Sequence, residues 1–98
     1  AQRKLRNAMF GMKPPLRLAI GALLLDGTPR APQAVFEALL PDYPGERQLS
    51  PESVKRHLQA LKVVGIARVE GESLDGSGNL VQTYALTGYG RRKVEAAL

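Results

Sequence analysis

The sequence contains no cysteine and no tryptophan, and His57 is its one histidine. Without cysteine there is no disulfide, no thiolate metal site and no thiol nucleophile. One histidine alone argues against a zinc site built only from protein ligands. We therefore expect neither a metal nor a cofactor.

Long hydrophobic runs are also missing. The longest apolar stretch, Leu18 to Leu25, is far shorter than the roughly 20 residues that a membrane-spanning helix needs. No segment combines a charged start, an apolar middle and a small-residue cleavage site. The sequence therefore predicts no membrane partner and a cytoplasmic location. A length of 98 residues fits one compact domain.

Residue patterns for catalysis are absent as well. We find no glycine-rich phosphate loop with a lysine, no paired carboxylates in an apolar setting, and no hydroxyl beside a usable base. The three tyrosines, Tyr43, Tyr84 and Tyr89, are too scattered to form the stacking platform of a single-strand or RNA binder. The sequence predicts that the protein is not an enzyme.

Positive charge is what the sequence has in excess. The net charge is +5, which favours polyanionic partners, although basic runs also serve solubility. The first acidic residue is Asp26, and the segment before it is purely basic. Its cationic residues are Arg3, Lys4, Arg6, Lys13 and Arg17.

Hydrophobic spacing and helix caps predict the order of elements. We expect a helix from Pro15 to Leu25, a second from Pro32 to Leu40, and a short strand at Arg47 to Leu49. A third helix should follow over residues 51–64, capped by Ser50. A hairpin from Ile66 to Leu86, turning at Asp75 to Asn79, and a last helix capped by Thr87 complete the chain. This is an α+β winged helix-turn-helix fold, with a three-helix core, a β-hairpin wing and a C-terminal helix. We assign residues 14–98 to this domain and residues 1–13 to a basic N-terminal arm or short helix.

The third helix has one apolar side and one polar side. Val54, Leu58, Leu61 and Gly65 share the first side, whereas Glu52, Arg56, Gln59 and Val63 share the second. The apolar side should pack against the core, and the polar side should face outward.

Two motifs resemble known regulators. The stretch from Ser53 to Leu61, ending in Val64-Gly65-Ile66, resembles the recognition helix of ArsR- and MarR-type bacterial regulators. Tyr84-Ala85-Leu86-Thr87, with Gly90 three residues on, resembles the exit from the wing in MarR and PadR proteins. The similarity covers about Pro15 to Val94. It implies a DNA-binding transcriptional regulator in which the equivalent of His57 packs at the edge of the core.

The major groove of DNA admits one α-helix, so residues 51–64 are the predicted recognition helix. Arg56 and Gln59 are expected to reach base edges, and Lys55 and Ser53 to contact phosphate. The predicted DNA-binding residues are Ser53, Lys55, Arg56, Gln59, Lys62, Arg68, Arg30, Arg3, Lys4, Arg6 and Lys13.

The wing departs from the resemblance because it is acidic. Arg68 is accompanied by Glu70, Glu72 and Asp75, which phosphate groups should repel. Either Arg68 alone reaches the groove edge, or the wing contacts protein while the N-terminal segment supplies positive charge. That segment could insert into a minor groove, form a dimerising helix through Leu5, Met9 and Met12, or remain a solvated tail.

Two functions follow from these patterns. The first is sequence-specific binding of double-stranded DNA by a small transcriptional regulator acting as a homodimer, which would place two recognition helices in successive major grooves. The alternative is a winged-helix module that binds another protein through its acidic wing and does not bind DNA.

Overall fold

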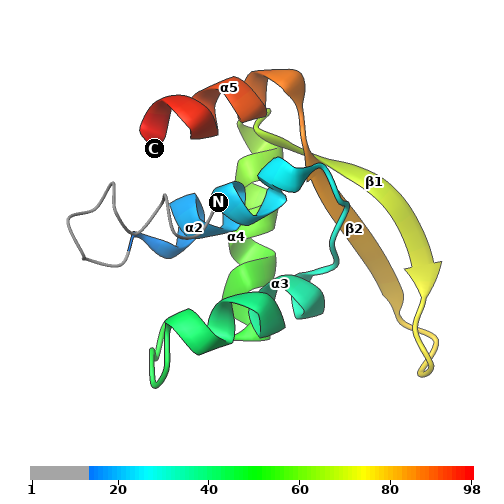
Figure 1. Cartoon of the computed structure of the whole chain (residues 1–98). Helices are drawn as coiled ribbons and strands as arrows, with labels where there is room; N and C mark the ends of the chain where they lie inside the picture. Colours follow the sequence, from blue (N-terminus) through cyan, green and yellow to red (C-terminus); the bar gives the residue numbers. More distant parts are fainter. Residues whose placement is uncertain (1–13) are drawn as a thin grey trace.

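The computed structural model describes residues 14–98, so the N-terminal arm predicted for residues 1–13 lies outside the described residues (Figure 1). The elements follow in the order α2 (Leu16–Leu23), a 3₁₀ turn (Leu24–Asp26), α3 (Pro32–Leu39), a 3₁₀ turn (Leu40–Asp42), α4 (Pro51–Val63), β1 (Ala67–Leu74), β2 (Leu80–Leu86) and α5 (Gly88–Ala97). Three helices, an antiparallel hairpin and a C-terminal helix form a winged helix-turn-helix, as the sequence predicts.

The core lies where α2, α3 and α4 meet the base of the hairpin. Its most deeply buried side chains are Ile20, Leu24, Val35, Leu39, Val54, Leu58 and Tyr84. Val54, Leu58 and Leu61 of α4 are all buried, which confirms the predicted helical phase for these three, whereas Gly65 lies beyond the end of α4 and is exposed. Their burial fixes the opposite side of α4 toward solvent.

Two side-chain caps set where α4 and α5 begin. The Ser50 hydroxyl accepts a hydrogen bond from the Ser53 amide at 3.1 Å, and the Ser53 hydroxyl accepts one from the Ser50 amide at 3.0 Å. This reciprocal pair satisfies two amides that a helix start leaves unpaired. Thr87 caps α5 in a similar way, because its hydroxyl accepts from the Gly90 amide at 2.8 Å. Both predicted caps are confirmed.

The short strand predicted at Arg47 to Leu49 is wrong. These residues form a turn, in which the Leu49 amide donates to the Glu46 carbonyl at 3.2 Å. Arg30 instead makes the extra β-bridge, by exchanging backbone hydrogen bonds of 3.0 and 2.9 Å with Tyr84. The buried side chain of Leu49 packs in the core without β-pairing.

The wing is a two-stranded antiparallel hairpin that extends away from the helices (Figure 1). Its register pairs Ala67 with Leu86 at the base and Leu74 with Leu80 at the tip, with an irregularity between Val69 and Gly71. At the turn, the Asp75 carboxylate accepts from the amides of Ser77 and Asn79 at 2.8 and 2.9 Å. These amide donors lower the pKa of Asp75.

The wing and α5 meet the end of α4 at one crowded junction. The Thr87 hydroxyl donates to the Gly65 carbonyl at 2.6 Å, and the Thr87 amide donates to the Ile66 carbonyl at 3.0 Å. Gly90 lies against this same carbonyl. A Cβ at position 90 would overlap the Ile66 carbonyl group, lying 2.6 Å from its carbon.

We predict that Gly90→Ala lowers the free energy of unfolding by about 3 kcal/mol or more, because a backbone carbonyl cannot move aside as a flexible side chain does. Gly88→Ala is the matched control, since it adds the same methyl two residues earlier in α5, where the nearest atom is the Arg92 side chain at 3.7 Å. Urea unfolding should show a large loss for the first variant and little change for the second. Equal stabilities would contradict the close approach.

Candidate nucleic-acid interface

The outer face of α4 carries the strongest cationic candidates. Lys55, Arg56, Gln59 and Lys62 are all exposed, and their side chains make no hydrogen bond or ion pair within residues 14–98. Lys62 in the last turn and Glu52 in the first lie at the helix ends that favour their charges. The face therefore offers free hydrogen-bond donors on a rigid helix.

Ser53 does not belong to this face. It is 7% exposed, and its hydroxyl is engaged in the α4 cap and donates to the Gln48 carbonyl. A hydroxyl held in this way supports the start of α4 and has little surface to offer a phosphate. The pair Ser50 and Ser53, spaced like a capping box, was the sequence signal for this role.

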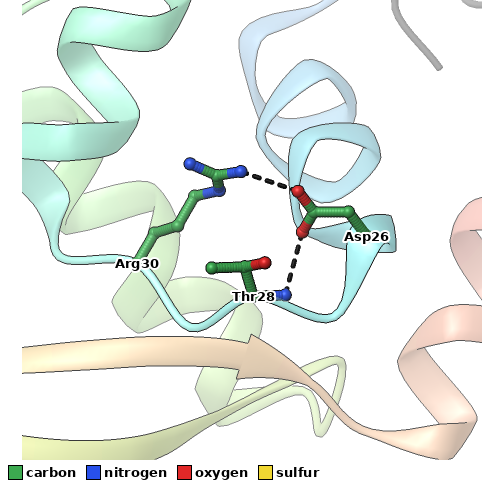
Figure 2. Close-up of polar contacts among 3 residues, drawn as sticks. All are labelled: Asp26, Thr28 and Arg30. Carbon is green, nitrogen blue, oxygen red and sulfur yellow. Dashed lines mark hydrogen bonds and ion pairs between the residues drawn. The ribbon is translucent and has the colours of Figure 1, made fainter.

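Arg30 lies between α2 and α3, where its backbone pairs with the base of the wing. Figure 2 shows the Asp26 carboxylate between two donors: the Thr28 amide at 2.9 Å and the Arg30 guanidinium at 2.7 Å. The Thr28 amide and the Arg30 hydrogen bond lower the pKa of Asp26. With its side chain 26% exposed, Arg30 is turned toward Asp26. Sequence reasoning missed Asp26, although its i,i+4 spacing from Arg30 was visible.

The wing supplies little free positive charge. Arg68 is ion-paired with Glu70 of the same strand, and Glu72 accepts from the Gln82 side chain at 3.3 Å. The wing therefore remains acidic in the fold. Arg3, Lys4, Arg6 and Lys13 lie outside the described residues, so the structure does not place them relative to α4.

A cleft of about 420 Å³ separates α4 from the wing. Lys55 and Gln59 line it from α4, while Leu80 and Gln82 line it from β2. Two of the predicted binding residues thus face one cleft. Arg56 lies on the same exposed side of α4 but does not line this cleft.

His57 marks the opposite edge of α4, facing α2. Its Nδ1 accepts a hydrogen bond of 3.1 Å from the Arg17 Nε–H. Burial lowers the pKa of His57, and the positive charges of Arg17 and Arg56 lower it further. The sequence predicted a packing role for this residue but not the Arg17 donor, because the two residues are 40 positions apart.

Residues 14–98 contain no cluster of three or more acidic or histidine side chains that could hold a metal ion. In this same range, no helix has the length and apolar character needed to cross a membrane.

Comparison with known protein families and with curated proteins gives no match. Among solved structures, the chain is similar to the crystal structure of a protein from Thermoplasma acidophilum that is named as a candidate transcriptional regulator, TA0346. The TM-score is 0.66 at 20% sequence identity, and the alignment covers 83% of this chain and 74% of the other. This likeness shows that the two chains share the winged-helix fold.

We predict that His57 makes stability depend on pH. Because folding lowers the pKa of His57 below its usual 6.5, the neutral ring stabilises the fold above that pH, and this contribution is lost as the pH falls. Lowering the pH from about 7.5 to about 5 should reduce the melting temperature of the parent more than that of His57→Gln. The side chain of glutamine accepts from Arg17 without titrating. Parallel pH profiles for the two proteins would contradict the assignment.

Proposed function

We propose that this chain binds double-stranded DNA sequence-specifically as a transcriptional regulator, with α4 in the major groove. The observation that carries the proposal is the outer face of α4, whose cationic and amide side chains are exposed and unpaired on a winged-helix scaffold. The groove of B-DNA is about 12 Å wide, which admits one helix with its side chains. The fold shared with a protein named as a candidate regulator supports the same function.

The proposed contacts divide by reach and chemistry. Arg56 lies centrally on the outer face and can donate two hydrogen bonds to a guanine, and Gln59, one turn on, can pair with an adenine. Lys55 and Lys62 flank this row and suit phosphate contacts, which set register. Ser53 and Arg30 are left out because both have polar partners within the fold. Arg68 keeps a secondary place, since a phosphate would have to compete with Glu70.

The proposal extends to the type of regulator, its oligomeric state and its location. The motifs around α4 and the exit from the wing favour a regulator of the ArsR, MarR or PadR type. A symmetric homodimer would place two α4 helices about one helical turn of DNA apart and would read a palindromic site. Binding to chromosomal DNA also fits the cytoplasmic location expected from the sequence.

We predict that Arg56→Ala weakens specific DNA binding by about 1 to 3 kcal/mol, because a side chain that reads bases is removed. Arg92→Ala is the matched control, because it removes the same charge from an exposed position on α5. Electrophoretic mobility shifts on a selected site would compare the two, with thermal melts confirming that both variants fold. Equal affinities would remove α4 from the recognition role.

A second prediction concerns the acid-free N-terminal segment. Deleting residues 1–13 should flatten the plot of log affinity against log salt by roughly 0.9 for each phosphate that the segment neutralises. Two or three such phosphates correspond to a change in slope of about 2 to 3. If the slope is unchanged, the segment does not contact DNA.

The alternative function, a protein-binding module with no affinity for DNA, gives a different salt response. Retention on immobilised duplex DNA should fall steeply with salt if phosphates are neutralised. A chain that is not retained on duplex DNA even at low salt would favour the alternative. The exposed apolar tip of the wing is the observation that keeps this alternative open.

A further inference from the structure

The tip of the wing is apolar and acidic. Leu74 and Leu80 are paired across the hairpin, so their side chains lie on one face, and they are 71% and 61% exposed. Around them, residues 71–80 contain Glu72 and Asp75 but no cationic residue. These two neighbouring exposed leucines form a small apolar patch on a projecting hairpin, which a partner could cover.

A groove elsewhere on the molecule is also apolar but carries charge of the opposite sign. A hollow of about 230 Å³ lies between α2, α4 and α5, lined by Leu18, Leu61, Ile66, Val94 and Ala97. Its two charged lining residues are Arg17, whose Nε–H also donates to His57, and Lys93, whose ammonium lies 5.5 Å from the centre of the Tyr89 ring. The groove is therefore apolar at its floor and cationic at its rim.

We propose that the wing tip of one copy of this chain docks in the α2–α4–α5 groove of a second copy. The leucine pair supplies apolar side chains for the groove, and Glu72 and Asp75 approach the cationic rim of Arg17 and Lys93. Apolar character and charge are thus complementary between two surfaces of the same chain. The occupant of the groove is a second wing.

A contact between two different surfaces can close or propagate. If each wing enters the groove of the other copy, the two contacts form a closed, two-fold symmetric dimer. Because the hairpin extends away from the helices, its tip is free to reach a second molecule (Figure 1). The reciprocal exchange doubles the buried surface. A single contact through one leucine pair would bury too little surface for a stable interface.

The proposed self-association does not depend on DNA binding. Arg56 and Gln59 face solvent, whereas Leu61 lines the groove from another side of α4. Self-association is measured without DNA, so its failure is distinguishable from failure of the proposed DNA-binding function.

Charge exchange tests the proposed interface directly. In sedimentation velocity over a concentration series, Glu72→Lys and Lys93→Glu should each weaken self-association by about tenfold or more, as substitution of a central interface residue does. The double variant Glu72→Lys/Lys93→Glu should recover most of the parental association, because the opposite charges meet again. Lys62→Glu, which makes the same reversal on the outer face of α4, should have little effect.

Complementation tests the wing tip and the groove separately. Leu74→Ser/Leu80→Ser removes the apolar side chains of the wing tip, and Ala97→Glu obstructs the groove at an exposed position. Neither variant should self-associate, and their mixture should associate only weakly compared with the parent, because the mixed pair keeps one of the two wing-to-groove contacts. Melting curves equal to that of the parent would show that both variants fold.

Two outcomes would overturn the proposal. The parent could remain monomeric up to millimolar concentration, or the leucine variant could associate as the parent does. In the second case, loss of association on deletion of residues 1–13 would assign the association to the N-terminal segment instead of the wing.

Discussion

The packing of Gly90 against the Ile66 carbonyl holds α4, the wing and α5 together. Ile66 follows the end of α4 and leads into β1, while Gly90 lies in the first turn of α5, just after β2. Thr87 ties the same backbone by accepting from Gly90 and donating to Gly65. A side chain at position 90 would push α5 away from the wing. The directions of the wing and α5 relative to α4 therefore depend on the absence of one Cβ.

The local features of this fold were readable from the sequence because each is encoded within a few residues. Ser50-Pro51-Glu52 marks the start of α4, and the spacing of Val54, Leu58 and Leu61 sets its buried side. The β-bridge beside the hairpin was not readable from the sequence. It joins Arg30 to Tyr84, which are far apart in the chain, and it has no alternating pattern of its own.

The candidate site was predicted in part for the same reason. Helical phase alone placed Arg56 and Gln59 on the exposed side of α4. Phase could not reveal which polar side chains already have partners. Ser53 is used by a cap, Arg30 by Asp26, and Arg68 by Glu70. A charged residue in a sequence counts toward a binding surface only after its internal partners are known, even where, as for Arg30 and Arg68, the partner lies within four residues along the chain.

The distribution of the remaining charge separates the two proposed surfaces. The phosphates of DNA would attract the exposed cations of α4 and repel the wing. In the wing, Glu72 and Asp75 have no cation paired with them in the described part of the chain. A wing held in the groove of a second copy would have these carboxylates near Arg17 and Lys93, so its charge would be offset by protein. In such a dimer the acidic wing no longer opposes DNA at full strength, because protein cations offset its charge.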